Sequence, residues 1–381
     1  MAKKPKPIKI DRSRRMFGNT ERNRAIRRIA VWVLLLVFVF AAFFFLTKPV
    51  SQFIGNLIQN ARNNASNSSS ITSGGETSQT NSGDNIREEV PHAITIIDVS
   101  ALQNTEMIIA TARNLQDEGI TEALIILKDE NGIFHYASSV PTAEGAFAGV
   151  QVNTEEIVRV FTEYDISVSA GIYAYRDPIA ANANRAMAVQ YRGQEGVTWL
   201  DNYPENGGKP WLNPYSEDAQ SYILQITQEL ADMGFNRVVV YAVQYPDVSN
   251  LGLTSYGPGE AQMTRDNALR QLITKLNALS ADSGVNISIV YPLAAVREEN
   301  IVSYIVNPLT LGQKSILIAL PATNAGQAWA QEDIRALVDA AKAEGIEEIA
   351  VYFTGVPYTA AEYTVLKQVA LAAGCEWVLF E

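Results

Sequence analysis

Aspartate residues stand where several predicted strands end, and they are the residues of this sequence best suited to acid–base chemistry. Asp98 follows the first apolar run, and Asp177 lies in the segment Tyr175-Arg176-Asp177-Pro178 after the third. A carboxyl group at such a place can serve as a general acid, a general base or a nucleophile. Aspartate also serves turns and helix N-caps well, so a structural role is the alternative for each. Other acids near the same strand ends are Asp129, Asp201, Asp247 and Glu260.

Aromatic residues are dense in the same segments. Tyr and Trp combine an apolar face with a polar tip and often form recognition surfaces, and flat apolar faces also suit sugar rings. Trp199 and Trp211 lie in a segment rich in Gly, Asn and Pro, so we expect them to make exposed contacts. The alternative is that several of these rings pack the core. The aromatic residues concerned are Tyr173, Tyr175, Tyr191, Trp199, Tyr203, Trp211, Tyr215, Tyr241, Tyr245, Tyr256 and Tyr291.

The sequence contains few residues of the types that bind metals or take part in cofactor chemistry. His92 and His135 are the only histidines, and Cys375 is the only cysteine. A zinc site, a Ser-His-Asp triad and a Cys-His dyad all need more of these residues than the chain offers. No glycine-rich phosphate-binding motif follows the first predicted strand. We therefore expect no metal and no cofactor, and we expect Cys375 to be a small buried apolar residue.

From about residue 90 the chain repeats one unit, an amphipathic helix that ends in glycine and is followed by a short apolar strand. Segments such as LADMGFNRVVVY and AKAEGIEEIAVY show the pattern, and residues 216–233 and 263–281 carry apolar residues at helical spacing. Glycine just past a helix is expected because it tolerates a left-handed backbone conformation. The glycines in question are Gly119, Gly234, Gly284, Gly345 and Gly374.

Eight continuous apolar runs are predicted to be strands of a parallel sheet that is covered on both faces. Eight strands that alternate with helices in about 290 residues predict a (β/α)8 barrel of the TIM type. An open doubly wound sheet is the alternative. Sites in such barrels are built at the carboxyl ends of the strands, where the long loops 129–150, 175–215 and 244–262 also lie. The runs cover about residues 93–99, 122–128, 166–174, 236–243, 285–291, 315–320, 347–353 and 375–380.

Four segments follow one another in a recognisable order. They are LKDENG at 127–132, YRDP at 175–178, WLNPY at 211–215 and VQYP at 243–246. In order and spacing they resemble the bacterial "putative glycoside hydrolase" domain family, an α-amylase-like barrel, over about residues 94–300. The resemblance implies a (β/α)8 barrel and a glycoside hydrolase activity for an intact member of the family.

The positions at which the resemblance implies catalytic groups hold other residues in this chain. Tyr241 occupies the position on the fourth strand at which the family has an Asp. Gln244 occupies the position of the family's Arg, three residues later. The end of the fifth strand reads Ile289-Val290-Tyr291-Pro292, without the family's Asp, while Ile126 and Gly171 replace an acid and an arginine. Glycoside hydrolysis normally needs two carboxyl groups beside the scissile bond. The resemblance therefore implies a barrel that is degenerate at its catalytic positions.

We expect any ligand to bind at the mouth of this barrel by ring stacking and hydrogen bonds rather than by ion pairing. Tyr241 and Tyr291 are predicted to line its wall, and the loop that holds Trp199 and Trp211 is predicted to cover it. No catalytic residue is assigned, although Asp98 and Asp177 are the candidates. The expected ligand-binding residues are Lys128, Tyr175, Trp199, Trp211, Tyr241, Gln244 and Tyr291.

A membrane anchor is predicted near the N-terminus. Residues 30–47 contain an uncharged run of Val, Leu and Phe that is just long enough to span a bilayer. No small-residue cleavage site follows it, which favours a signal-anchor over a cleaved signal peptide. Residues 1–29 carry 11 Lys and Arg against two acids, a net charge of +9, whereas the whole chain carries −11. The remainder therefore carries −20, and the positive-inside rule places the N-terminus in the cytoplasm and the large domain outside.

Four regions follow from these patterns: a basic cytoplasmic tail (1–29), a transmembrane helix (30–47), a juxtamembrane segment with a flexible Ser/Asn/Gly linker (48–89), and the barrel (90–381). The tail and the anchor are expected to contact membrane lipid, and the acidic outer domain argues against nucleic acid as a partner. Three hypotheses stay open: a non-catalytic barrel that binds a cell-wall glycan or envelope protein, an active glycoside hydrolase, and a protein scaffold without a glycan ligand.

Overall fold

The computed structural model describes residues 92–140, 146–194, 196–248, 251–321, 329–355 and 360–381. The chain divides into two units at Ile86 and Arg87, and the described residues all belong to the second. The predicted anchor at 30–47 and the linker lie outside the described residues. Within the described part, no helix has the length and apolar character needed to cross a bilayer.

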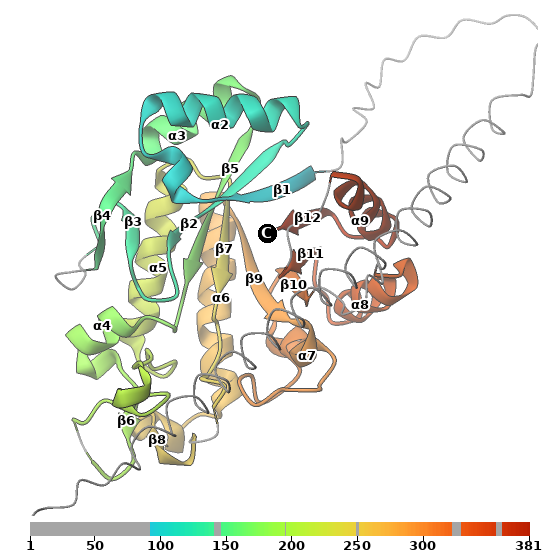
Figure 1. The fold of residues 1–381 in the computed structure, drawn as a ribbon. Helices are drawn as coiled ribbons and strands as arrows, with labels where there is room; N and C mark the ends of the chain where they lie inside the picture. The colour runs from blue at the N-terminus through green and yellow to red at the C-terminus, as the bar shows by residue number, and fades with distance from the viewer. Residues whose placement is uncertain (1–91, 141–145, 195, 249–250, 322–328, 356–359) are drawn as a thin grey trace, which may run out of the picture. The chain divides into compact units, whose positions relative to one another are not determined.

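Eight parallel strands form a closed barrel, as the apolar runs predict (Figure 1). Each strand is bonded to the next around the ring, and the pairing of β1 with β2 closes it, which excludes the open sheet. In spatial order the strands are β1 (His92–Ile97), β12 (Trp377–Phe380), β11 (Glu348–Thr354), β10 (Ser315–Pro321), β9 (Asn286–Pro292), β7 (Arg237–Tyr241), β5 (Ser167–Tyr173) and β2 (Glu122–Lys128).

Helices surround the barrel, and most follow a strand directly in the chain (Figure 1). The two helices predicted from apolar spacing are confirmed, and all five predicted glycines have a positive φ. The connection between β9 and β10 is an exception, because it holds only α7 (Leu293–Val296) and the 3-10 turn Pro308–Leu311. The other helices are α2 (Thr105–Asp117), α3 (Thr154–Glu163), α5 (Glu217–Asp232), α6 (Arg265–Ser283), α8 (Gln331–Ala343) and α9 (Ala360–Ala372).

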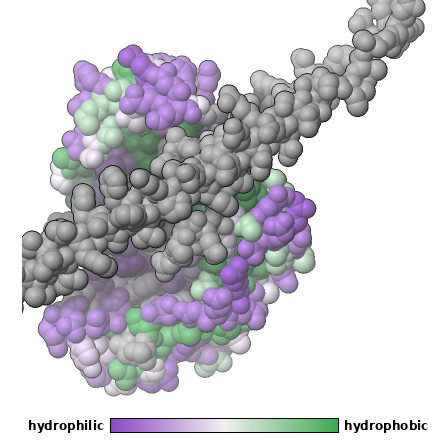
Figure 2. Space-filling view, turned by 45° about the vertical axis from the view of Figure 1, so that its right-hand side comes forward, coloured by the Kyte–Doolittle hydropathy of each residue, from purple (hydrophilic) through white to green (hydrophobic). Residues whose placement is uncertain are grey.

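All three of the predicted long loops carry structure of their own. The connection after β2 contains β3 (Phe134–Tyr136) and β4 (Phe147–Val152), which extend the sheet beyond the barrel. The connections after β5 and β7 together form a lobe with α4 (Pro178–Ala183) and a small sheet of β6 (Gln190–Tyr191) and β8 (Thr254–Ser255). Figure 1 shows β6 and β8 side by side, away from the barrel strands. The visible face of the molecule is largely hydrophilic, with smaller apolar areas (Figure 2).

Side chains alternate along each barrel strand between two separate cores. One large core lies between the strands and the surrounding helices, and a smaller cluster fills the barrel itself. On β7, for example, Val238 and Val240 belong to the outer core, whereas Val239 and Tyr241 belong to the inner cluster. This alternation follows from the period of two along a strand, and it decides which residues can reach the interior. The buried members of the inner cluster are Ile94, Leu124, Val239, Tyr241, Leu317, Ala350, Trp377 and Leu379.

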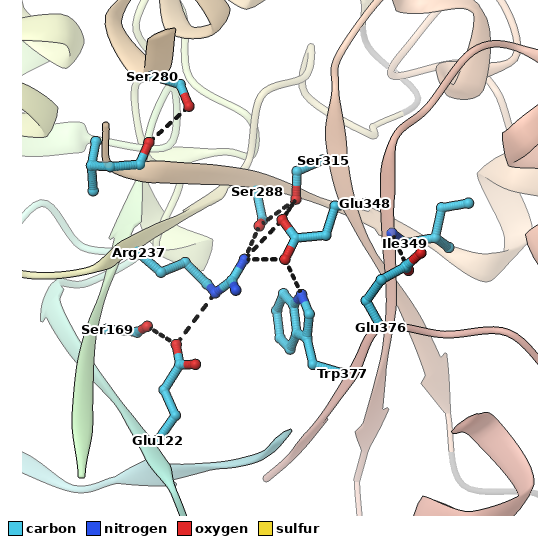
Figure 3. A network of polar contacts seen from close by, with 11 residues as sticks. Glu122, Ser169, Arg237, Ser280, Ser288, Ser315, Glu348, Ile349, Glu376 and Trp377 are labelled. Atoms are coloured by element: carbon cyan, nitrogen blue, oxygen red, sulfur yellow. Dashed lines mark hydrogen bonds and ion pairs between the residues drawn. The ribbon is translucent and has the colours of Figure 1, made fainter. Parts of the chain in front are cut away.

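Charged groups enter the barrel at its amino-terminal end. The Arg237 guanidinium lies 3.3 Å from the Glu122 carboxylate and 3.0 Å from that of Glu348, and it stacks over the Trp377 ring with 4.3 Å from Cζ to the ring centroid. The Trp377 indole N–H also donates to Glu348. Figure 3 shows these side chains pointing toward one another, with three serine hydroxyls beside them. Those hydroxyls belong to Ser169, Ser288 and Ser315.

Replacing Arg237 should be among the most destabilising single changes in the domain. Arg237→Met leaves Glu122 buried without its cation, and loss of one partner of a buried pair typically costs about 3–5 kcal/mol. The exposed pair between Arg159 and Glu163 provides the matched control, since Arg159→Met should cost less than about 1 kcal/mol. Chemical denaturation of both variants gives the two free energies of unfolding. Equal, small losses in the two would contradict the structural role of Arg237.

Candidate active site at the barrel mouth

At the carboxyl ends of its strands, the barrel interior is only partly shielded from solvent in the part of the chain that the structure describes. The uppermost inward-facing side chains of five strands are half-buried rather than fully enclosed, and they pack on the inner cluster. The residues that belong to this layer are Ile96, Ile126, Tyr173, Val290 and Tyr352. We call this opening the mouth, and it coincides with the end of a barrel at which sites are normally built.

Three tyrosines dominate the mouth. The Tyr173 and Tyr241 rings stack with centroids 5.0 Å apart and planes 14° from parallel, and Tyr352 faces inward from β11. Tyr241 is only 7 % exposed, yet its hydroxyl has no hydrogen-bond partner among the described groups. Burial, followed by the charge effects of Tyr352, Tyr173 and Glu381, raises the pKa of Tyr241 well above its usual range. All three phenols are therefore neutral at physiological pH and can both donate and accept hydrogen bonds.

Charged side chains form the rim of the mouth. The Arg176 guanidinium lies 2.8 Å from the Glu130 carboxylate, and both side chains are more than a third exposed. The Asp129 carboxylate lies 3.5 Å from Nε2 of His135 and also accepts the backbone N–H groups of its own turn. Glu381 is exposed and accepts the N–H of Gly355 at 2.6 Å.

Ile126 and Gly171 lie against each other in the mouth wall. A Cβ atom at Gly171 would lie only 2.4 Å from Cδ1 of Ile126 and 3.4 Å from the Tyr241 ring. Ile126 therefore occupies the space over Gly171, beside Tyr241. The resemblance implies an acid and an arginine at these two positions, whereas Ile126 and Gly171 make this part of the wall apolar.

Lys128 and Asp177 lie together, but outside the barrel interior. Nζ of Lys128 lies 2.8 Å from the Asp177 carboxylate and donates to the Tyr173 carbonyl at 2.6 Å, and neither side chain is exposed. The register of β2 against β5 shifts between Ile126 and Lys128, which is a β-bulge. A one-residue shift turns a side chain to the other face of a strand, so Lys128 points to the helices rather than the mouth. Asp177 also caps α4, which is the structural alternative foreseen for it.

Tyr175 and Tyr291 also belong to the outer core. Both are fully buried among the strands and helices outside the barrel, and the Tyr291 hydroxyl donates to Gln313 at 3.3 Å. The inward-facing residue of β9 at this height is Val290. The expectation that Tyr291 lines the mouth wall is wrong by one residue, because successive side chains of a strand face opposite ways.

Trp199 and Trp211 are buried, so the expectation of exposed contacts is wrong for both. Trp199 is 0 % exposed and Trp211 is 6 % exposed, and both belong to the outer core. The Trp211 indole N–H donates to Asp201 at 3.0 Å. The polar composition of the segment suggested an open loop, but β6, β8 and α4 fold it into a lobe whose centre these rings fill.

Asp98 and Gln244 occupy the strand ends but are engaged locally. Asp98 caps the 3-10 turn Val99–Leu102 by accepting the Ser100 N–H at 2.7 Å, and this hydrogen bonding lowers its pKa. Gln244 is half-buried and accepts the Tyr304 hydroxyl at 2.7 Å. Among the residues proposed from sequence, Tyr241 is the one that lies in the mouth wall. The described residues also contain no group of three or more His, Cys, Asp or Glu side chains that could hold a metal ion.

Sequence reasoning missed Tyr352, Glu130, Arg176 and Glu381 as parts of the mouth. Tyr352 could have been found by counting in steps of two along β11, because Ala350 and Glu348 face inward from the same strand. Glu130 and Arg176 stand in the quoted segments LKDENG and YRDP, directly beside the residues that were chosen. No local sequence pattern marks Glu130 and Arg176 as site residues, because the ion pair between them forms only when two separate loops come together.

The closed ring of eight parallel strands with its open carboxyl end defines a (β/α)8 barrel protein. A family model described as "Putative glycosyl hydrolase domain" matches residues 94–305, more than half of the chain, and the chain belongs to this family. The resemblance predicted from the four segments is confirmed. No curated protein sequence matches the chain.

Several solved structures are similar to the chain at low identity. A hypothetical protein from Ruminiclostridium thermocellum ATCC 27405 is 20 % identical, with 51 % of this chain and 96 % of that one covered and a TM-score of 0.43. A family 20 β-N-acetylglucosaminidase is 12 % identical (69 % and 52 % covered, TM-score 0.41). A cycloisomaltooligosaccharide glucanotransferase from Paenibacillus is also 12 % identical (69 % and 38 % covered, TM-score 0.45). The chain spans about half or less of these two enzymes, and the likeness carries no conclusion about substrate.

Proposed function

We propose that this chain is a membrane-anchored, extracytoplasmic glycosidase-like barrel that binds a cell-envelope glycan at the mouth without hydrolysing it. One observation carries the proposal. Within the eight described strands, the upper inward-facing positions hold three tyrosines and neighbouring residues without a carboxyl group, and the carboxylates that act on the tyrosines lie just beyond the strand ends, Glu130 after β2 and Glu381 after β12. The wall of this barrel, which belongs to a glycosyl hydrolase family, therefore lacks the carboxyl groups that glycoside hydrolysis normally requires.

The mouth offers what a sugar ring needs for binding. Tyr173 and Tyr352 present half-exposed rings against which the apolar face of a pyranose can stack. The exposed Glu130–Arg176 pair supplies donors and acceptors for sugar hydroxyl groups.

The carboxyl groups inside the barrel are placed at the wrong end for hydrolysis. Glu122 and Glu348 point into the barrel from the first residues of their strands, where Arg237 binds both. A glycosidase acid has to be a protonated carboxyl, which active sites obtain by burial in apolar surroundings. Glu130, whose charge acts on Tyr173, has a side chain that is 44 % exposed and is paired with Arg176.

An active glycoside hydrolase is the second candidate function. The observation that favours it is the exposed Glu130 carboxylate at the mouth, beside Arg176 and next in sequence to Asp129. Loop carboxylates could then replace the missing strand acids. A protein scaffold that holds an envelope protein instead of a glycan is the third candidate, and it would make no use of the mouth.

Binding without turnover is the expected result with glycan ligands. The full-length chain in detergent is incubated with cell-wall fragments and oligosaccharides, and both bound ligand and new reducing ends are measured. Tyr352→Ala removes a stacking ring at a half-exposed position and should weaken binding by about 2 kcal/mol, roughly 30-fold. Glu347→Ala, at an exposed position just before the same strand and at its opposite end, is the control and should bind normally.

Turnover decides between the first two candidates. Sustained release of reducing ends that Glu130→Gln abolishes would contradict the non-catalytic proposal and establish the hydrolase. Normal binding by Tyr352→Ala, together with loss of binding in a variant far from the mouth, would show that the mouth is not the binding site.

The anchor and the localisation are part of the same proposal. They are supported by the uncharged run within residues 30–47 and by the basic charge of residues 1–29. The basic tail and the anchor would contact anionic lipid, while the acidic domain would lie among envelope glycans and proteins. A domain tethered in this way meets its ligand at a membrane surface.

Protease treatment of intact spheroplasts tests the topology. We expect the large domain to be digested and the tail of residues 1–29 to be protected, because the positive-inside rule keeps the tail in the cytoplasm. Immunoblots against the two ends of the chain give the result, with lysed spheroplasts as the control in which both are digested. Protection of the large domain in intact spheroplasts would reverse the orientation and exclude a role in the envelope.

A further inference from the structure

We infer that Tyr203 is the stacking platform of a second sugar-binding subsite, so that the ligand of this domain is a long glycan chain rather than a mono- or disaccharide. This inference rests on the proposed glycan-binding function and adds the length of the ligand to it. Three features carry it: the exposure of the Tyr203 ring, the fixed loop that presents the ring, and the polar side chains that join this loop to the mouth.

The exposure of Tyr203 is the first feature. Tyr203 is 69 % exposed, more than any other large hydrophobic residue in the part of the chain that the structure describes. Trp199 and Trp211, from the same connection, are buried in the lobe. Single exposed apolar residues are common on protein surfaces, so exposure alone does not define a site. It does leave a flat apolar face free for a sugar ring.

Hydrogen bonds fix the loop that presents this ring, which begins at Asp201 and ends at Lys209. The Asp201 N–H donates to the Lys209 carbonyl at 3.0 Å, and the Lys209 N–H donates to the Asp201 carboxylate at 2.7 Å. The Tyr203 carbonyl accepts the Gly208 N–H at 3.0 Å, and a Cβ atom at Gly208 would lie only 2.0 Å from the Asn202 carbonyl oxygen. The backbone of Tyr203 is therefore ordered before a ligand binds, which lowers the entropic cost of binding.

Polar side chains join this loop to the mouth. The Lys209 ammonium group donates to the side-chain oxygen of Asn131, which follows Glu130 in the turn after β2. The Glu130 carboxylate lies 2.8 Å from the Arg176 guanidinium on the rim. All four of these residues are partly exposed. A glycan that leaves the mouth over Glu130 and Arg176 thus meets hydrogen-bonding groups until it reaches the loop of Tyr203.

A chain of sugar rings uses these features together. One ring of the chain stacks in the mouth on Tyr173 or Tyr352, while a ring further along stacks on Tyr203. Binding at two linked points raises the overall affinity, because the first contact holds the second ring at a high effective concentration. A protein partner would need a contiguous surface of about 800 Å² on each side, whereas Tyr203 is the only aromatic or large aliphatic residue of its loop.

Titrations with cell-wall fragments of two lengths test the inference. The full-length chain in detergent is titrated calorimetrically with disaccharide fragments and with long fragments of the same composition. Tyr203→Ala should lose roughly 30-fold in affinity for the long fragments, the typical loss for one aromatic contact, and should keep its affinity for the disaccharides. Tyr203→Phe keeps the ring and should bind both as the unaltered chain does.

A second exposed apolar residue of the lobe provides the matched control. Leu253 is 54 % exposed, and Leu253→Ala should change neither affinity. Tyr352→Ala should weaken the binding of both kinds of fragment, because both use the mouth. Hydrogen–deuterium exchange gives an independent readout, since long fragments should slow exchange in residues 202–208 and disaccharides should not.

The outcomes separate the inference from the proposed function. Unchanged affinity of Tyr203→Ala for long fragments, while Tyr352→Ala loses affinity, would overturn the inference and leave glycan binding at the mouth intact. Equal losses in Tyr203→Ala and Leu253→Ala, or in Tyr203→Ala and Tyr203→Phe, would also overturn it, because the effect would not come from ring stacking. Failure of every fragment to bind would overturn the proposed function together with the inference.

Discussion

The buried charges at the amino-terminal end of the barrel are the interaction on which the rest of the structure depends. Arg237 binds Glu122 and Glu348 from strands on either side of it, and the serines and Trp377 of the network extend it to seven of the eight strands. Buried charges are costly unless each finds its partners, so the network fixes how the strands must be registered when the ring closes. A slip of one residue in any of these strands would turn its polar group out of the barrel.

The two ends of the closed barrel differ in the side chains that they contain. The paired carboxylates hold the amino-terminal end together, and an apolar layer that includes Leu124, Val239 and Leu317 lies inside above them. The carboxyl end is then built from tyrosines over an apolar wall, with charged side chains on the rim, among them the Glu130–Arg176 pair. A barrel that hydrolysed glycans would need the opposite distribution, with acids in the wall at the open end. Binding is the function that this distribution supports.

The sequence predicted the architecture well but predicted the directions of side chains poorly. Continuous apolar runs and glycines past helices located all eight strands, because a parallel sheet buried on both faces leaves that pattern. The same runs hide which face each residue takes. A bulge turned Lys128 outward, the inward residue of β9 is Val290 instead of Tyr291, and the Trp199 ring was drawn into a lobe that forms only when two distant loops pair. Register shifts and long-range pairing of this kind leave no local trace in sequence.

Hydrogen–deuterium exchange of the full-length chain with and without soluble cell-wall fragments tests the central claim, which is that the mouth is the binding site. We expect slower exchange in the segments that directly follow Tyr173, Tyr241 and Tyr352, because the ligand would cover the strand ends that carry these rings. Exchange at the amino-terminal end of the barrel, around Arg237, should not change. Slower exchange confined to β4 or to the lobe of β6 and β8, with the three strand ends unaffected, would contradict the claim.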